Sequence, residues 1–429
     1  MRLPTSSVLA LLGSGVLIAC GGSSDATPYP TAPMDAGNPF GADVGAGDAG
    51  ASQDSGLPAG YPALKPDMPQ VVHGSGPVML APKFVAITFQ GDAFQTQIAD
   101  FVSTVGQTDY WASTVTEYGS LSAATGMAVP PLTEKAPASI DDSAVGPWLA
   151  QKIANAILPA PTADTLYTIF YPASTIVTLQ GSTSCQQFGG YHNESTTNAG
   201  VSFSYAVIPR CASFGAMTGI DVITGSASHE FIEATTDPLP QSDPAYGQVD
   251  NDHIIWEVVL GGGEIGDLCA QDPRAFYKPS GFAYTVQRTW SNKSALAGHD
   301  PCVPNLPGPY FNSAPVLVDA LTLSGNGGGS LATKGASIAL GKSKAIEFDL
   351  YSDAPTSGAW TAKLYDSVTL TGGGAANLSF SPSVISGKNG DTAHVTVTVK
   401  SAGQYGFESF VVVNELGQTG SYWVGMVSN

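Results

Sequence analysis

The chain has 429 residues, of which 43% are hydrophobic and 12% are charged. It is therefore long enough for two or three folded units and apolar enough to bury a core in most of its length. Its 16 Lys and Arg residues stand against 35 Asp and Glu residues, a formal net charge of −19, which argues against nucleic acid or an anionic membrane surface as a partner.

The first twenty residues, MRLPTSSVLALLGSGVLIAC, contain one basic residue and then an apolar run too short to span a bilayer. This pattern is typical of an export signal. Its last four residues, LIAC, resemble the bacterial lipobox, which implies removal of residues 1–19 as a lipoprotein signal peptide and lipidation of Cys20. Because Gly21 follows, the resemblance implies an outer-membrane or cell-surface location in a diderm bacterium, with the lipid anchor as the contact with the membrane. A signal peptide without lipidation is the alternative.

Residues 20–62 are rich in Ala, Gly, Pro and Asp and contain almost no branched apolar residues. Burial in such a segment cannot offset the entropy of ordering it, so we predict a disordered tether. After Cys20 the chain has four cysteines, and in an exported protein this number predicts two disulfides. Proximity favours the pairs Cys185–Cys211 and Cys269–Cys302 over the other connectivities. A thiolate metal site is the alternative, but the chain has no CxxC pair.

Residues 63–305 mix two kinds of pattern. Strand-like runs of β-branched and aromatic residues cover 83–89 and 165–171, whereas 94–105 and 146–157 space apolar residues three and four apart, as helices do. Interleaved strands and helices predict an α+β domain with an α/β core. Residues 306–429 contain short runs with a period of two, such as the alternation at Val395, Val397 and Val399, and predict an all-β, immunoglobulin-like sandwich domain.

The sequence GSASHEFIEATTDP, residues 225–238, places His229, Glu230 and Glu233 on one predicted helix. Residues four apart share a helix face, so His229 and Glu233 could bind one cation with Glu230 beside them. This is the HExxH arrangement of metallopeptidases with glutamate as the second ligand. Imidazole and carboxylate suit Zn2+, and Glu230 is the candidate general base. Pro238 ends the helix, whose polar face we expect to line a cleft.

Further ligands have to come from other segments. In GGGEIGDLC, residues 261–269, glycines allow close backbone approach beside Glu264 and Asp267. In FGGYHNE, residues 188–194, His192 follows a glycine pair. Each has a structural alternative: Asp267 as a helix cap, and His192 as a hydrogen-bonded core or turn histidine. Residues 243–253 gather Asp and His residues that could bind Ca2+, but they lack the regular ligand spacing of a calcium loop, and a solvated loop is the favoured interpretation.

Several of these segments together resemble the phosphate-induced protein 1, or exordium-like, family of plants and bacteria. FGGYHNE, YAVIP, SHEFIEATTDP, GEIGDLC and VQRTWSN occur in the family's order, and the resemblance covers about residues 70–304. It implies a secreted protein with a zincin-like domain, and it places the family's motif residues at His192, His229, Glu230, Glu233, Asp237, Glu264 and Asp267. The lipobox, an acidic insertion between Pro238 and Gly261 and the β-sandwich depart from the family pattern, so the plant growth role is not carried over.

Two functional hypotheses follow from the sequence. The first is a surface lipoprotein with a zinc-dependent hydrolase site, whose substrate is a peptide or a cell-surface polymer. In it His229, Glu233 and one of Asp267, Glu264 or His192 hold Zn2+, and Glu230 activates water. The second is a non-catalytic cell-surface binding protein with a structural metal or polar cluster and a ligand-binding β-sandwich. An open coordination position favours the first hypothesis, and a closed site favours the second.

Overall fold

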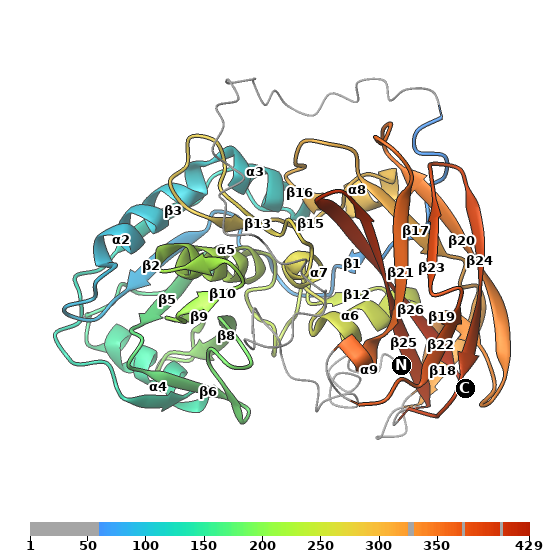
Figure 1. The fold of residues 1–429 in the computed structure, drawn as a ribbon. Coiled ribbons are helices and arrows are strands. Elements are labelled where there is room, and N and C mark those ends of the chain that lie inside the picture. The colour runs from blue at the N-terminus through green and yellow to red at the C-terminus, as the bar shows by residue number, and fades with distance from the viewer. Residues whose placement is uncertain (1–59, 325–329, 371–373, 404–405) are drawn as a thin grey trace.

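The computed structural model describes residues 60–429 except 325–329, 371–373 and 404–405. The predicted signal peptide, Cys20 and the tether up to residue 59 lie outside the described residues. The described chain forms a mixed α/β part and a β-sandwich, which lie side by side (Figure 1). Among the described residues, no helix is both long and apolar enough to cross a membrane.

A five-stranded sheet organises the α/β part. Its order is β3-β2-β5-β9-β8, and its strands are β3 (Thr125–Ala128), β2 (Lys83–Ile87), β5 (Thr165–Tyr171), β9 (Ser202–Pro209) and β8 (Tyr191–Thr196). Neighbouring strands are parallel except for the edge strand β8, which runs antiparallel to β9. The predicted strands at 83–89 and 165–171 are thus confirmed as β2 and β5.

Helices cover both faces of this sheet. They are α2 (Gln95–Thr104), α3 (Asp109–Val115), α4 (Asp142–Ala154) and α5 (Ile220–Thr236), with the 3-10 turns η1 (Val105–Gln107) and η2 (Thr116–Tyr118). Phe84 of β2 packs with α2, α3 and α5 in one core, whereas Val85 packs with α4 in the other. Successive strand residues therefore point to opposite faces, and both faces are buried. The two helices predicted at 94–105 and 146–157 are α2 and the C-terminal part of α4.

Short elements connect these layers. They are β1 (Val71–Val72), β4 (Ser139–Asp141), β6 (Ile176–Leu179), β7 (Ser182–Thr183), β10 (Ser213–Phe214), β11 (Met217–Thr218), β12 (Gln248–Val249), η3 (Asn251–His253), α6 (Ile254–Leu260), α7 (Asp267–Ala270), β13 (Phe276–Tyr277), β14 (Val286–Gln287), β15 (Thr289–Trp290), α8 (Asn292–Ala297) and β16 (Cys302–Val303). Of these, β14 packs along α5, and α6 and α7 lie between the α/β part and the sandwich (Figure 1).

The sandwich consists of two sheets. One has the order β17-β20-β24-β22 and the other β18-β19-β26-β25-β21-β23. The elements are β17 (Phe311–Pro315), β18 (Asp319–Ser324), β19 (Ser330–Ser337), β20 (Ser343–Ser352), β21 (Trp360–Asp366), α9 (Ser367–Leu370), β22 (Leu378–Ser381), β23 (Val384–Gly387), β24 (Thr392–Val399), β25 (Phe407–Leu416) and β26 (Thr419–Ser428). Val395, Val397 and Val399 of β24 are fully buried, which confirms the predicted alternation and the β-sandwich.

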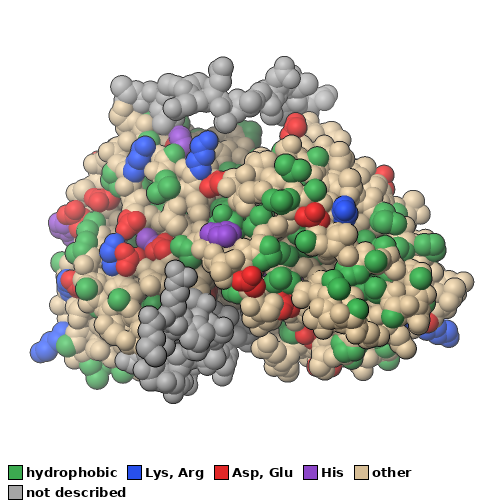
Figure 2. Space-filling model, turned by 180° about the vertical axis from the view of Figure 1, so that it is seen from behind, with side chains coloured by type: hydrophobic (Ala, Val, Ile, Leu, Met, Phe, Trp, Pro, Cys, Tyr) green, Lys and Arg blue, Asp and Glu red, His purple; other side chains and the backbone are tan. Residues whose placement is uncertain are grey.

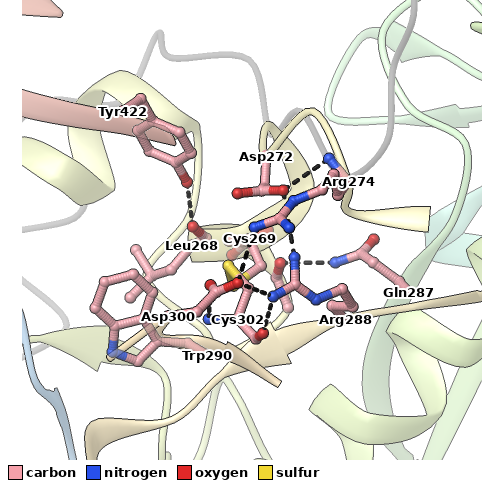
Figure 3. Close-up of a disulfide and its surroundings, with 12 residues drawn as sticks. Leu268, Cys269, Asp272, Arg274, Gln287, Arg288, Trp290, Asp300, Cys302 and Tyr422 are labelled. Atoms are coloured by element: carbon pink, nitrogen blue, oxygen red, sulfur yellow. Dashed lines mark hydrogen bonds and ion pairs between the residues drawn. A yellow bond between two sulfur atoms is a disulfide. The ribbon is translucent and has the colours of Figure 1, made fainter. Parts of the chain in front are cut away.

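The α/β part and the sandwich share one continuous hydrophobic core. Trp256 of α6 packs against Trp290, Tyr422 and Trp423, with ring centroids 5.6 to 5.8 Å apart, and Tyr422 and Trp423 belong to β26. The Tyr422 hydroxyl also donates a hydrogen bond to the carbonyl of Leu268 in α7 (Figure 3). The last strand of the chain is therefore in direct contact with the segment that carries Asp267.

Both predicted disulfides are present, Cys185–Cys211 and Cys269–Cys302, with S–S distances of 2.08 and 2.05 Å. Beside the second lies a buried ion-pair network (Figure 3), in which the fully buried Arg288 pairs with Asp272 and Asp300. Arg274 pairs with Asp300 as well, at 3.1 Å. Each buried charge thus has a partner of opposite sign, as burial requires.

Candidate metal centre

Helix α5 carries the HExxE sequence into the interior of the protein. It starts after Gly219, whose positive φ of 58° turns the chain into the helix, and it ends at Thr236, before Asp237 and Pro238 as predicted. Every residue from Val222 to Thr236 is buried. The polar face that we expected to line a cleft is instead enclosed, because β8, β9 and β14 pack along the helix.

Six side chains meet on this face, and we call them the His–carboxylate cluster. They come from α5, from β8 and from the segment that leads into α7, and they are His229, Glu230, Glu233, His192, Glu264 and Asp267. All six were candidates from the sequence, and the structure brings them together. Asp237, the seventh motif residue, lies next to them: its carbonyl contacts His192, and its carboxylate accepts a hydrogen bond from Ala245 N at 2.8 Å.

The hydrogen bonds of Gln287 define which nitrogen of His229 carries the proton. The Gln287 amide nitrogen donates to the Gly266 carbonyl at 2.8 Å, and since a carbonyl can only accept, the amide oxygen must face the other way. That oxygen lies 3.0 Å from His229 Nδ1, so Nδ1 is the donor. The lone pair of a neutral His229 is therefore on Nε2, the nitrogen that points into the cluster.

His229 Nε2 and Glu233 Oε2 lie 3.0 Å apart, although both are acceptors when the imidazole is neutral and the carboxyl ionised. Nε2 is buried and has no hydrogen-bond partner among the described residues. Asp267 Oδ1 lies 3.8 Å from the same nitrogen. Three acceptors that face one another in a buried space repel each other unless a proton or a cation lies between them.

His192 shows the same arrangement from the opposite side. Its Nε2 lies 3.1 Å from the Asp237 carbonyl and must donate to it, so the lone pair of the neutral ring is on Nδ1. Nδ1 faces Glu230 Oε2 at 3.6 Å and Glu233 Oε2 at 3.7 Å. Glu264 Oε1 lies 3.5 Å from Nε2, and it has no hydrogen-bond partner among the described residues.

Glycines let the backbone approach the cluster closely. A Cβ added to Gly190 would lie 2.7 Å from Glu230 Oε1, and one added to Gly266 would lie 2.6 Å from Glu233 Oε1 and 2.8 Å from His229 Nδ1. These glycines belong to the FGGYH and GEIGD segments. The expectation that glycine permits close approach in GGGEIGDLC is met at Gly266, where the glycine adjoins Asp267.

Burial dominates the electrostatics of the cluster. It raises the pKa of Glu230 to about 8, and it raises the pKa values of Glu233, Glu264 and Asp267 above their ordinary values, with neighbouring carboxylates adding to the first two. Burial also lowers the pKa of His192. In the absence of a cation the carboxyl and imidazole groups of the cluster thus favour their neutral forms, because burial deprives the charged forms of hydration.

The donor set fits a divalent metal ion. Two neutral imidazole nitrogens and several carboxylate oxygens are ligands typical of Zn2+. Bond lengths of about 2.0–2.2 Å put tetrahedral ligands about 3.4 Å apart, and the separations of 3.0 and 3.8 Å around His229 bracket this value. The orphaned Nε2 and the fixed tautomer of His229 are what a bound metal requires.

The residues considered for Ca2+ make other contacts. Asp250 accepts hydrogen bonds from Gln70 N at 2.7 Å and pairs with His253 at 2.8 Å, whereas Asp252 pairs with Lys334 at 2.7 Å. Asp243 accepts a hydrogen bond from the Ser75 hydroxyl. Among the described residues, the groups whose ligand atoms converge as a metal site requires do not include these three carboxylates.

Gln287 is the functional residue that sequence reasoning missed. It lies on β14 within the VQRTWSN segment and is fully buried, and its backbone N–H donates a hydrogen bond to the Ser228 hydroxyl at 2.9 Å. No spacing rule relates position 287 to position 229. The available signal was the place of Gln287 in VQRTWSN, one of the segments that resemble the exordium-like family.

The face drawn in Figure 2 shows no dominant basic feature among the described residues. On the face drawn in Figure 2, the Lys and Arg side chains of the described residues are scattered among acidic and neutral ones. This distribution agrees with the net charge of −19 and gives no support to a phosphate-binding surface.

The sequence matches no protein-family profile and no curated protein. Among solved structures, similarity is found to the CsuC–CsuE chaperone–tip adhesion subunit complex of archaic Csu pili of Acinetobacter baumannii (10% identity, TM-score 0.16, 21% of this chain and 51% of that chain). It is also found to the YadV chaperone (9%, 0.16, 22% and 47%) and to domains 4 and 5 of the S-layer protein SbsC (15%, 0.16, 30% and 68%). The chain spans about half the length of the first two. Similarity at this level assigns neither a family nor an activity.

Proposed function

We propose that the protein is a zinc-dependent hydrolase of the cell surface that cleaves a peptide or a related amide. The observation that carries the proposal is the pair of acceptors 3.0 Å apart, His229 Nε2 and Glu233 Oε2, with the imidazole tautomer fixed by Gln287. A cation between them removes the repulsion. No Lys or Arg among the described residues forms an ion pair with the cluster, so a metal ion is the cation that the donor set favours.

Each residue of this site has a role that follows from its position. His229, Glu233 and Asp267 hold the metal, and Gln287 keeps His229 in the tautomer that leaves Nε2 free. When bound, Zn2+ supplies Lewis acidity toward water and toward the substrate carbonyl. Glu230, whose carboxylate oxygens have no hydrogen-bond partner among the described residues, accepts the proton of the attacking water and returns it to the leaving amine.

The arrangement of the domain supports a zincin-like interpretation. A mixed sheet with one antiparallel edge strand lies against α5, and that edge strand, β8, carries His192. The sequence motifs that resemble the exordium-like family, including HExxE, supply the six cluster residues. We therefore extend the proposal to membership in that family, and to an immunoglobulin-like type for the sandwich. The plant growth role is not part of it.

The location forms part of the same proposal. The export signal, the lipobox at Cys20 and the tether predicted from the sequence would place the folded part outside the inner membrane and tie it to the cell surface through lipid. Two disulfides agree with an oxidising compartment. Labelled palmitate incorporation that is lost in Cys20→Ala tests the anchor, and unchanged incorporation would remove it.

The test of the hydrolase uses purified residues 60–429 incubated with Zn2+ and freed of excess metal. We expect elemental analysis to find at least one bound zinc ion per chain, and we expect the protein to cleave members of a fluorogenic peptide library. Both the bound zinc and the cleavage should be lost in His229→Ala. In Glu230→Gln, cleavage should be lost while zinc is retained. His299→Ala is the matched control, because His299 pairs with Asp353 outside the cluster. A wild-type protein that binds no zinc would eliminate the proposal.

A second candidate function is a non-catalytic binding protein with a structural metal, which the burial of the cluster favours. Glu230 and Glu233 are only 1% and 2% exposed, and the Glu264 side chain, at 17%, is the most open member. A small hollow beside the Cys185–Cys211 disulfide is lined by Val222 and Ser226 of α5 but by no cluster side chain. Bound zinc without cleavage of any peptide in the library would support this function.

A further inference from the structure

We propose that the His–carboxylate cluster holds a second divalent cation, between His192, Glu230 and Glu233, and that Glu233 is shared by the two positions. The inference rests on the metal site of the proposed function but does not depend on hydrolysis. It gives His192 a role of its own, because in the first position the metal is already held by His229, Glu233 and Asp267.

The ligand atoms fall into two overlapping sets. Within each set, either His229, Glu233 and Asp267 or His192, Glu230 and Glu233, one ligand atom from every residue lies within 4.8 Å of the others. Glu233 Oε2 is the shared atom, since it lies 3.0 Å from His229 Nε2 and 3.7 Å from His192 Nδ1. A carboxylate between two ligand sets can bridge two cations, as carboxylates do in two-metal sites.

The second set contains unsatisfied atoms that the first position does not use. Both oxygens of Glu230 are buried without a hydrogen-bond partner among the described residues, and Glu230 Oε2 faces His192 Nδ1 at 3.6 Å. The His192 side chain is 3% exposed, and its other nitrogen donates to the Asp237 carbonyl. The lone pair of His192 is thus aimed at carboxylate oxygens that have no proton to offer when ionised.

The charge of the cluster is also compatible with two ions. Its four carboxylates, those of Glu230, Glu233, Glu264 and Asp267, carry four negative charges when ionised, which two divalent cations would balance. Imidazole with carboxylate oxygen suits Zn2+ in both positions.

Occupancy of the second position changes what Glu230 can do. In the one-cation form the Glu230 carboxylate is free to accept a proton, whereas in the two-cation form it is a metal ligand and has lost that capacity. We therefore expect less peptide cleavage at two bound zinc ions per chain than at one.

The experiment is zinc binding to the metal-free protein by equilibrium dialysis followed by elemental analysis, with near-UV circular dichroism to confirm folding. We expect two zinc ions per wild-type chain, one in His192→Ala, one in Asp267→Asn and none in the double variant. His299→Ala should still bind two. Glu230→Gln should keep the first ion and bind the second at least tenfold more weakly, because a neutral amide replaces a charged ligand.

The possible results separate the two proposals. Saturation of the wild type at one zinc ion together with peptide cleavage would overturn the second position and leave the hydrolase standing. Two ions at saturation, with no cleavage at one zinc ion per chain either, would support the second position and remove the hydrolase. Two ions in His192→Ala would also overturn the inference, and a wild type that binds none would remove both proposals.

Discussion

In the proposed zinc site, Gln287 is the residue that controls His229 most directly, because it accepts the hydrogen bond from Nδ1. We predict that Gln287→Leu weakens zinc binding about 10- to 100-fold, the usual effect of removing the hydrogen-bond partner of a metal-bound histidine, because Nδ1–H loses its acceptor. A competition titration with a chromophoric chelator measures this. Gln287→Glu retains an acceptor and should lose less affinity. Equal affinity of wild type and Gln287→Leu would contradict the assigned tautomer.

Gly266 tests the close packing around the same histidine. A methyl group at this position would meet both Glu233 Oε1 and His229 Nδ1 below 3 Å, so Gly266→Ala must displace one of them. We predict a loss of zinc binding of at least tenfold, read by the same titration. The matched control is Gly358→Ala, where a Cβ has no atom within 4 Å. If Gly266→Ala bound zinc like the wild type, the cluster would have to be less tightly packed than the structure shows.

At the scale of elements, helix α7 is the weakest support of the site. It has four residues, Asp267–Ala270, too few for a helix to be stable on its own. The Cys269–Cys302 disulfide and the hydrogen bond from the Tyr422 hydroxyl hold it in place. The backbone N–H of Trp290 also donates to the Ile265 carbonyl, just before α7, at 2.8 Å. Asp267 therefore takes its position from neighbouring segments.

We predict that replacing Cys269 and Cys302 together by alanine costs about 2–5 kcal/mol of stability and also weakens zinc binding. The Cys185–Cys211 pair is the matched control, because the two disulfides close loops of similar length, 33 and 26 residues. Removing that pair should cost similar stability with a smaller effect on zinc. Urea unfolding and chelator competition measure the two quantities. Unchanged zinc affinity in the Cys269 and Cys302 variant would show that α7 is positioned without the disulfide.

The sequence was sufficient to predict the elements whose pattern is local. The runs at 83–89 and 165–171 are strands because β-branched and aromatic residues fill them, and α5 ends where Pro238 requires it. Both disulfides followed from proximity. What could not be predicted depends on contacts between distant segments. The tautomers of His229 and His192 are decided by hydrogen-bond partners 58 and 45 residues away, Gln287 and Asp237. The enclosure of the HExxE face likewise depends on strands from other parts of the chain.

At the scale of the whole molecule, the buried carboxyls predict how stability depends on pH. Burial raises the pKa of Glu230 to about 8, that of Glu257 to about 7 and that of Asp237 to about 6. Raised values mean that the folded state binds more protons than the unfolded state, so the stability of the metal-free protein falls as pH rises from about 4 to 8. We expect a lower Tm at pH 8 than at pH 5 in chelator-treated protein, and a smaller difference with zinc. A Tm that rises with pH in the metal-free protein would contradict this.

The shared core predicts that the sandwich supports the metal centre. In Tyr422→Phe the Leu268 carbonyl loses its donor, and we expect weaker zinc binding, by up to about tenfold, from looser positioning of Asp267. Tyr167→Phe is the control, because its hydroxyl donates to the Pro159 carbonyl at 2.6 Å, remote from the cluster. Calorimetric titration measures both. If the two variants bound zinc alike, the contact from β26 would be structural only.

Strand β26 is the last element of the chain and an inner strand of the six-stranded sheet. The segment that holds Asp267 thus receives one of its supports from a strand 154 residues further along the chain. Damage confined to β26 would therefore reach the cluster through Asp267, whereas His229 and Glu233 keep the packing of α5 against β8, β9 and β14.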